Sequence, residues 1–183
     1  MIPVGKWFDR GFRFDIPIQL FPNVVERVRG TPIRIEEKVG GVPPEMLTRR
    51  ENNSWSIQEN VGHLLDLEVL HTTRLQEFVE GVRVLTAADL NNQKTHTANH
   101  NSHPIESILN SFRAKRSHFI SIVEKLDAGV IARTALHPRL NQMINVLDLC
   151  YFMAEHDDHH LARINELLHL SATTPSAESF TSR

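Results

Sequence analysis

Apolar residues recur every three to four positions along four long segments of the chain, and polar residues dominate the stretches between them. This spacing places the apolar side chains on one face of an α-helix. Alternation with a period of two, which would predict strands, is not convincing anywhere. The pattern predicts an all-α fold, a four-helix bundle, with helices over about residues 21–39, 56–80, 104–126 and 145–170.

Local signals mark the ends of the second helix and a break in the first. Ser56 is followed three residues later by Glu59, which is the spacing of a capping box, and Gly81 suits a C-terminal cap. Within the first helix, Thr31 can cap a helix and Pro32 suits a first helical position. We therefore expect that helix to bend or restart near residue 31.

The connections and the termini lack helical periodicity. Residues 84–102 form a long polar stretch and "TALHPRLNQM" a second connection, which leaves room for a topology other than up-down-up-down. We expect one domain over residues 1–170 and a disordered tail over residues 171–183. Residues 1–18 look irregular, with four aromatic side chains available to anchor them to the core: Trp7, Phe8, Phe12 and Phe14.

Composition excludes some classes of function. The 183 residues are 40% hydrophobic and 23% charged, with a formal net charge of −2, so there is no basic excess for binding nucleic acid. Charged residues interrupt the N-terminal segment, so no signal peptide or membrane span is expected there. Cys150 is the only cysteine, and we expect it to be a buried structural thiol. These features favour a cytoplasmic protein.

Two histidines lie on the core-facing side of the predicted fourth helix. At about 100° per residue, His156 and His160 fall within the arc of its apolar side chains. They are four residues apart, so both rings can point at one locus. Asp157 and Asp158 fall outside the arc and are expected to face solvent. On the second helix, His63 lies toward one side of the apolar face.

Histidines that face a bundle core need a common explanation, because burying an unpartnered imidazole costs roughly a few kcal/mol. A divalent metal supplies one, since neutral imidazole binds Zn²⁺ or Ni²⁺ well, with Mn²⁺ and Fe²⁺ as alternatives. Three protein ligands would leave coordination positions open for water or substrate, which is a catalytic arrangement. The alternative is that these histidines are hydrogen-bonded packing residues.

Two segments carry a family resemblance: "WSIQENVGHLLDLEVLHTTRL" (residues 55–75) and "EHDDHHLARINEL" (residues 155–167). They resemble the signature segments of the DinB-like superfamily, which includes the YfiT-type candidate metal-dependent hydrolases. The resemblance covers roughly residues 20–170. It implies a bundle of up-down-down-up order and a divalent metal, often nickel or zinc, bound by His63, His156 and His160.

Further residues are candidates for supporting roles. Glu59 or Asp66 could orient the ring of His63; the alternatives are the capping box for Glu59 and a solvated carboxylate for Asp66. His71 is expected either to line the pocket or to pack, and His159, at the edge of the arc, could add a fourth ligand. The long connection offers a second metal site, a lid or simply a polar surface loop through three histidines: His96, His100 and His103.

The functional hypotheses follow from the metal. The first is a metal-dependent enzyme acting on a small-molecule substrate, either a hydrolase or, as some relatives imply, a transferase of a low-molecular-weight thiol. The second is a non-catalytic bundle that binds a metal or small ligand in a stress response, and the third is a bundle without metal. Homodimers are common among helix bundles and in the family, and the sequence specifies no interface.

Overall fold

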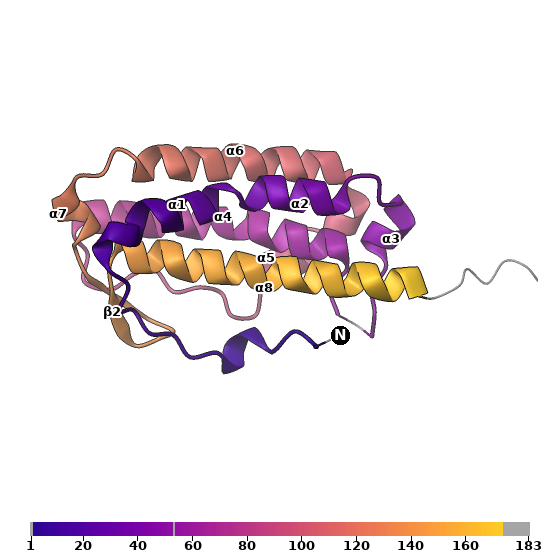
Figure 1. The fold of residues 1–183 in the computed structure, drawn as a ribbon, viewed down its shortest axis with the longest axis horizontal. Helices are drawn as coiled ribbons and strands as arrows, with labels where there is room; N and C mark the ends of the chain where they lie inside the picture. The colour runs from indigo at the N-terminus through magenta and orange to yellow at the C-terminus, as the bar shows by residue number, and fades with distance from the viewer. Residues whose placement is uncertain (1, 53, 174–183) are drawn as a thin grey trace, which may run out of the picture.

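Four long helical segments form the molecule (Figure 1). The structure, a computed structural model, describes residues 2–52 and 54–173. The first segment consists of α1 (Phe21–Arg29) and α2 (Thr31–Val39), and the others are α4 (Ile57–Glu80), α6 (Ile105–Val123) and α8 (Val146–Thr173). The shorter elements are η1 (Trp7–Asp9), η2 (Ile18–Leu20), α3 (Pro44–Thr48), α5 (Gln93–Thr97), η3 (His100–Ser102), α7 (Ala128–Ile131), β1 (Ala135–His137) and β2 (Gln142–Ile144).

Contacts between the helices fix their directions. Gln58 near the start of α4 donates to the carbonyl of His103 just before α6, and Glu68 in mid-α4 pairs with Arg116 in mid-α6. These two helices therefore run parallel, and the connection between them must cross the length of the bundle. The α1–α2 segment runs parallel to α8, as seen from its side-chain bonds: Arg27 to Asp158 and Lys38 to Asn165.

The order of directions is therefore up-down-down-up, as the family resemblance implied. In Figure 1, α4 and α6 both run from the end of the bundle near α3 toward the end near α7, and the α1–α2 segment and α8 run the opposite way. The predicted all-α four-helix bundle is confirmed. The exception is the small β1–β2 hairpin, which falls where an irregular connection was expected.

The caps predicted for the second helix are confirmed. The side chain of Ser56 accepts from the backbone N–H of Glu59 at 3.1 Å, and the Glu59 carboxylate accepts from the backbone of Ser56 at 2.9 Å. Gly81 ends α4 with φ 76°, a left-handed conformation that glycine adopts without steric cost. The break in the first helix lies at Gly30, one residue before the expected position. Thr31 does not cap the helix.

The hydroxyl of Thr31 instead reaches a buried carboxylate, and this corrects one expectation. Asp157 was expected to face solvent, but it is 1% exposed and accepts from Thr31 at 2.7 Å. It also pairs with Arg116, whose guanidinium bonds Glu68 and the carbonyl of Val28. A helical wheel for α8 alone could not predict this, because the partners lie on other helices. Asp158 is partly exposed.

The charged group around Arg116 lies among the apolar side chains that fill the bundle. One apolar cluster joins α1, α4, α6 and α8 toward the α7 end, and a second joins α2, α3, α4, α6 and α8 toward the other end. Glu68, Arg116 and Asp157 are all nearly inaccessible to solvent. A paired arrangement of this kind is tolerated in a core because each charge has an opposite partner.

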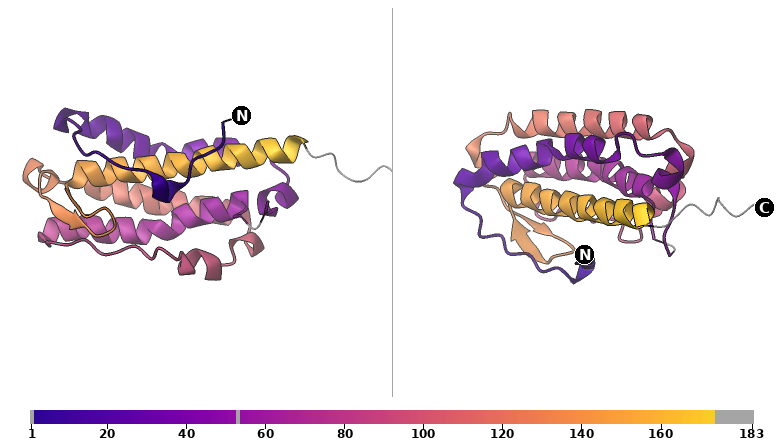
Figure 2. Two further views of the ribbon diagram at one scale, coloured as in Figure 1. Left: turned by 90° about the horizontal axis from the view of Figure 1, so that it is seen from below. Right: turned by 45° about the vertical axis from the view of Figure 1, so that its right-hand side comes forward.

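Three segments outside the long helices lie along one side of the bundle (Figures 1 and 2). They are the N-terminal segment, the β1–β2 hairpin and the connection from α4 to α5. The hairpin is antiparallel, with Ala135 opposite Ile144, and the backbone N–H of Leu85 in the connection donates to Leu136 at 3.0 Å. The connection thus adds a third short segment beside the hairpin.

Two of the expected aromatic anchors hold the N-terminal segment in place. Trp7 and Phe12 are buried and pack with Phe152 of α8, and Phe14 is partly buried beside them. Phe8 is not an anchor: its side chain is 59% exposed and lies against the guanidinium of Arg139. The 3₁₀ turn η1 directs Trp7 inward and Phe8 outward, which explains the difference.

The last helix is longer than expected. It continues to Thr173, three residues beyond the predicted end, and the remainder of the expected tail, residues 174–183, lies outside the described residues. Over residues 2–52 and 54–173, no helix combines the length and the apolar character needed to cross a bilayer.

Candidate metal centre

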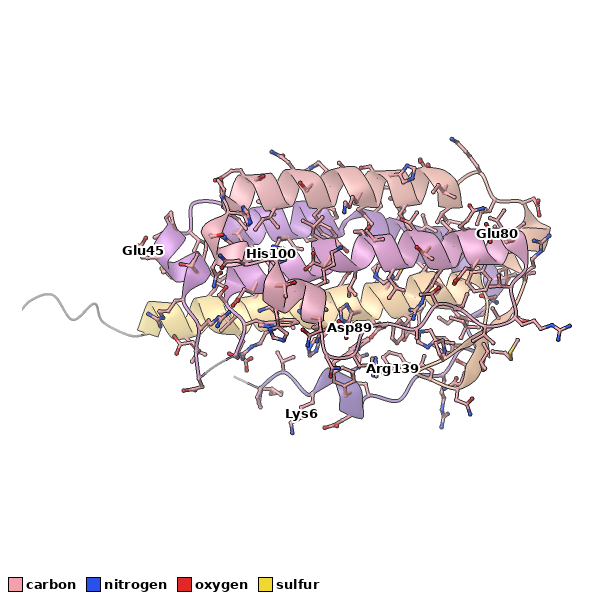
Figure 3. All side chains as sticks on the ribbon, turned by 180° about the vertical axis from the view of Figure 1, so that it is seen from behind. Lys6, Glu45, Glu80, Asp89, His100 and Arg139 are labelled. Atoms are coloured by element: carbon pink, nitrogen blue, oxygen red, sulfur yellow. The ribbon has the colours of Figure 1, made fainter. Side chains whose placement is uncertain are left out.

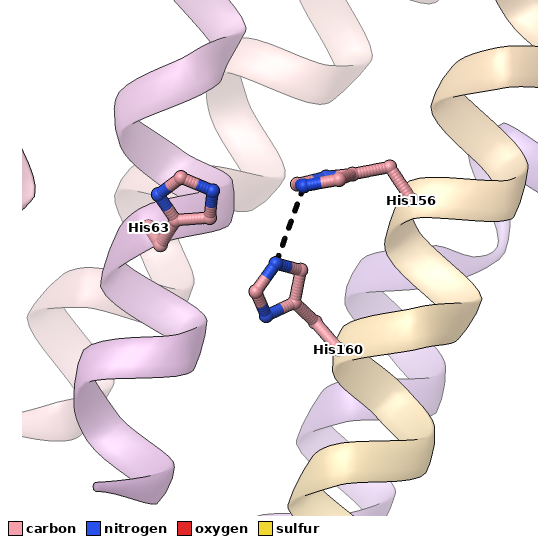
Figure 4. Close-up of side chains that lie close together, drawn as sticks. All are labelled: His63, His156 and His160. Atoms are coloured by element: carbon pink, nitrogen blue, oxygen red, sulfur yellow. Dashed lines mark hydrogen bonds between the residues drawn. The ribbon is translucent and has the colours of Figure 1, made fainter. Parts of the chain in front are cut away.

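The three histidines singled out in the sequence lie together between α4 and α8 (Figure 4). One ring nitrogen from each of His63, His156 and His160 lies within 4.8 Å of those of the other two. The three residues are 5%, 8% and 6% exposed. Within the described residues, they are the only group of three or more His, Cys, Asp or Glu side chains that converge in this way.

A hydrogen bond that His160 donates to Asn60 fixes the orientation of the His160 ring. Nδ1 of His160 lies 2.8 Å from Oδ1 of Asn60. The Asn60 amide nitrogen donates to the backbone carbonyls of Ser56 and Trp55, so its oxygen is the atom that must accept. His160 therefore carries its proton on Nδ1, and the lone pair on Nε2 faces the other two rings.

Thr95 fixes His63 in the same way, from the connection between α4 and α6. Oγ1 of Thr95 lies 3.0 Å from Oδ2 of Asp66 and 3.1 Å from Nδ1 of His63. A hydroxyl has one proton, and an ionised carboxylate can only accept. Thr95 therefore donates to Asp66 and accepts from His63, which leaves the lone pair on Nε2 of His63.

Asp66 also holds His100, one of the histidines of the long connection. Nε2 of His100 lies 2.8 Å from Oδ2 of Asp66. Although burial alone would raise the pKa of Asp66, the bonds from His100 and Thr95 and the charge of Lys94 hold it below its usual value. The surface-loop interpretation is wrong for His100, which is buried against α4. His96 and His103 are exposed, and His96 lies beside the ring of Trp55.

His156 has no such partner. Its Nδ1 is buried without a hydrogen bond among the described residues, and its Nε2 lies 3.3 Å from Nε2 of His160. Burial lowers the pKa of His156 and His160 well below the ordinary value, and that of His63 to about 4. All three rings are thus neutral at pH 7, and nitrogens able to donate a lone pair converge on one point. This donor set fits a divalent metal such as Zn²⁺ or Ni²⁺.

A cavity of about 690 Å³ opens from the histidine cluster. Trp7 and Trp55 line the cavity next to the cluster. The ring centroid of Trp7 lies 4.8 Å from that of His156, and the ring centroid of Trp55 lies 4.7 Å from that of His63. Its outer lining comes from the three segments on this side of the bundle, and Figure 3 labels three of the lining residues: Lys6, Asp89 and Arg139. A small molecule could therefore reach the histidines from this side.

The other predicted residues take different places. Glu59 bonds Ser56 and pairs with Arg50, and its described bonds do not include His63. His159 is half-buried and lines the cavity beside Trp7. His71 is buried and lines the same cavity, with Nδ1 unpartnered among the described residues. Cys150 is buried, which raises the pKa of its thiol to about 12, as suits a structural thiol.

Sequence reasoning missed the residues that orient the histidines. Asn60 precedes His63 by nearly one helical turn, so its place near the cluster could have been read from helical spacing. Thr95 lies 32 positions from His63 in a segment without periodicity, and no local signal marks it. Trp55 begins one of the two segments that carried the resemblance, but its role as a cavity wall depends on the tertiary structure.

Comparisons with known proteins agree with the observed fold. The chain is similar to YfiT from Bacillus subtilis, "a probable metal-dependent hydrolase with an unusual four-helix bundle topology", with a TM-score of 0.78 and 16% identity over 90% of this chain and 95% of that one. It is also similar to the mycothiol-dependent maleylpyruvate isomerase, with a TM-score of 0.64 and 7% identity over 80% of this chain and 60% of that one. At these identities, both likenesses show the fold alone.

No curated protein matches the chain. The model of the DinB superfamily matches residues 28–164, which is more than half of the 183 residues. The matched region runs from α1 into α8 and contains all three clustered histidines. The sequence match and the bundle topology agree, and the chain belongs to the DinB superfamily.

Proposed function

We propose that His63, His156 and His160 hold a divalent metal ion and that the protein is a metal-dependent enzyme acting on a small molecule. The observation that carries this proposal is the convergence of three neutral imidazoles, two of them oriented by hydrogen bonds at Nδ1, at the inner end of a cavity.

A three-histidine site favours catalysis over simple metal storage, because coordination positions remain for water or substrate. A fourth protein ligand would weaken this argument. Asp66 is already bonded to Thr95 and His100, and His159 lies outside the converging group. When bound, the metal would polarise an electrophile and lower the pKa of a water or thiol at the site.

Among the residues of this chain, we assign the proton acceptor to His159. The carboxylates that line the cavity are otherwise engaged: Asp89 accepts from the backbone N–H groups of Asn91 and Gln93, and Glu166 pairs with Arg163. Burial and the charges of Arg10 and Arg163 lower the pKa of His159, so its ring is neutral at pH 7 and able to take up a proton. Its ring centroid lies 5.2 Å from that of His160.

Water and a low-molecular-weight thiol remain the two candidate nucleophiles. Hydrolysis is supported by the likeness to YfiT, and thiol transfer by the likeness to a mycothiol-dependent enzyme. A panel of ester, amide and electrophilic substrates, assayed with and without added thiols, separates them. Turnover that requires the thiol would assign a transferase, and turnover in water alone would assign a hydrolase.

Metal content tests the proposal directly. Untagged protein purified without added metal is analysed for elements, next to His160→Ala and to His118→Ala, which removes an exposed histidine on α6. We expect about one zinc or nickel per chain in the wild type and in His118→Ala, and its loss in His160→Ala. A wild type without metal, whose melting is unchanged by added Zn²⁺ or Ni²⁺, would overturn the proposal.

A further inference from the structure

Two arginines are buried in this bundle, and they differ in their counter-charges. Arg116 is 1% exposed and pairs with both Glu68 and Asp157. Arg74, on α4, is 2% exposed, yet no carboxylate among the described residues lies within 4.0 Å of its guanidinium. Burying a charge without an opposite partner is costly. Arg116 has carboxylate partners, whereas Arg74 has none among the described residues.

The polar contacts of Arg74 leave part of its hydrogen-bonding capacity unused. Nε donates to the carbonyl of Thr86 at 2.9 Å, and Nη1 lies 3.2 Å from Nε2 of His137. Nη2 is buried with no partner among the described residues. Burial lowers the pKa of Arg74 to about 10 although the charge of Glu77 acts to raise it, so the side chain remains charged at pH 7. His137 is neutral there, because burial lowers its pKa to about 4.

Arg74 lines the same cavity as the histidine cluster. It follows His63 by eleven residues on α4, which is about three turns and an offset of only about 20° around the helix. Leu67 and Leu70 lie on the same strip between them and also line the cavity. Along α4, the cavity is thus lined by His63 at one end, by Leu67, Leu70 and the neutral imidazole of His71 in the middle, and by Arg74 at the other end.

The remaining charges around the cavity do not neutralise Arg74. Glu166 pairs with Arg163, and Asp89 is held by backbone N–H groups at the start of α5. Arg139 also lines the cavity without an ion pair among the described residues, and its guanidinium lies against the rings of Trp7 and Phe8. An anionic ligand would therefore meet uncompensated positive charge at the end of the cavity away from the histidines.

We propose that Arg74 binds the carboxylate of the substrate, an amphipathic small molecule whose apolar part lies along Leu67 and Leu70 and whose reactive group lies at the histidine cluster. A carboxylate fits this site because it is a planar acceptor of single charge, and Nη2 of the guanidinium has no hydrogen-bond partner among the described residues. The assignment of the reactive end rests on the proposed function. The anion site itself depends only on Arg74 and its surroundings.

Binding of octanoate, with octan-1-ol as an uncharged probe of the same length, tests the site. Calorimetric titrations use the full-length protein as purified and again after chelation, in the wild type, Arg74→Gln and Arg74→Lys. We expect octanoate to bind at least about tenfold more weakly to Arg74→Gln in both metal states, as the loss of a charge-assisted hydrogen bond implies. Arg74→Lys should recover part of the lost octanoate affinity, and the affinity for octan-1-ol should be the same in all three proteins.

Arg113→Gln is the matched control, because it removes an exposed arginine on α6 that pairs with Glu36 far from the cavity lining. Equal octanoate affinity in wild type and Arg74→Gln would overturn the proposal. The proposal would also be overturned if octanoate binding disappeared on chelation and had the same affinity with and without Arg74, since the carboxylate would then bind the metal.

If Arg74→Gln fails to fold, a shift of the Arg74 Nε–H NMR signal with octanoate but not with octan-1-ol supports the site, and no shift overturns it. Arg74-dependent binding in a protein that takes up no metal would overturn only the proposed function.

Discussion

The imidazole of His100 lies directly against the backbone of α4 at Gly62. A Cβ placed on Gly62 would come within 2.2 Å of the His100 ring. The absence of a side chain at this one position allows the connection between α4 and α6 to dock on the helix. Through His100, Asp66 and Thr95, this docking extends to His63.

Gly62→Ala should therefore destabilise the protein, although alanine is the better helix former. Helix propensity alone would stabilise α4 by about 1 kcal/mol, whereas displacing a packed ring costs about 1–3 kcal/mol. Urea unfolding should show a net loss. Gly11→Ala is the control, because a Cβ there has nothing within 4 Å. If Gly62→Ala stabilised the protein instead, the connection between α4 and α6 could move away from α4 without a measurable loss of stability.

Thr95→Val should weaken metal binding while leaving the three histidines in place. It removes the hydroxyl that accepts from Nδ1 of His63 and donates to Asp66. Loss of such an outer partner typically costs about 10–100-fold in metal affinity. Competition against a chromogenic chelator measures the change, and Thr95→Ser, which keeps the hydroxyl, should bind as the wild type does. Equal affinity in all three proteins would refute the role of Thr95.

Arg116→Gln should be strongly destabilising. The substitution leaves Glu68 and Asp157 buried together without their shared cation, and breaking such a group costs about 3–5 kcal/mol. Chemical denaturation provides the measurement. Arg113→Gln breaks the exposed pair with Glu36 and should cost less than about 1 kcal/mol. Similar losses in the two variants would show that burial does not strengthen the Arg116 group.

Arg74→Gln should behave in the opposite way to Arg116→Gln. Because the buried Arg74 has no carboxylate partner among the residues that the structure describes, removing its charge relieves a desolvation cost, and we expect stability to rise by about 1 kcal/mol. The same denaturation experiment tests this. A loss as large as that of Arg116→Gln would show that Arg74 supports the fold rather than a ligand.

Stability of the chelated protein should fall as the pH drops from about 6.5 to about 4. The pKa of His137 is lowered to about 4 by burial and by the charges of Arg74 and Arg139. Between the two values the unfolded chain binds a proton that the folded chain does not, which favours unfolding by up to about 1.4 kcal/mol per pH unit for each such histidine. Above about 6.5 this effect is absent.

His137→Gln should therefore make the stability of the chelated protein less steep in pH over that window. Denaturation curves collected within the window and above it provide the slopes. His118→Gln is the control, since His118 is exposed. An identical slope in His137→Gln and wild type would contradict a neutral His137 in the folded state.

The sequence predicted the helices and the pairing of His156 with His160 well, because both depend on helical period, whereas the inclusion of His63 rested largely on the family resemblance. His156 and His160 share a face of α8 whatever surrounds them, and the capping box at Ser56 is a local feature. Asp157 was misjudged since its environment is set by Arg116 and Thr31, which lie on other helices. The hairpin was missed because three-residue strands carry too little alternation to detect.

The same limit explains why Thr95, His100 and Arg74 were not assigned. Thr95 and His100 reach the site only because their segment folds back along α4. Arg74 has an ordinary surface residue type, and its burial without a carboxylate partner becomes visible only when its surroundings are known.

The parallel course of α4 and α6 has a consequence for how this protein could diversify. Joining two parallel helices requires a return segment, and here the return segment carries Thr95 and His100 to the back of the histidine cluster. The bundle helices carry the candidate ligands, and the return segment carries a hydrogen-bond partner of His63 and part of the cavity lining. Insertions or substitutions in that segment can therefore retune reactivity while the hydrophobic core is left intact, which separates the evolution of chemistry from the maintenance of the fold.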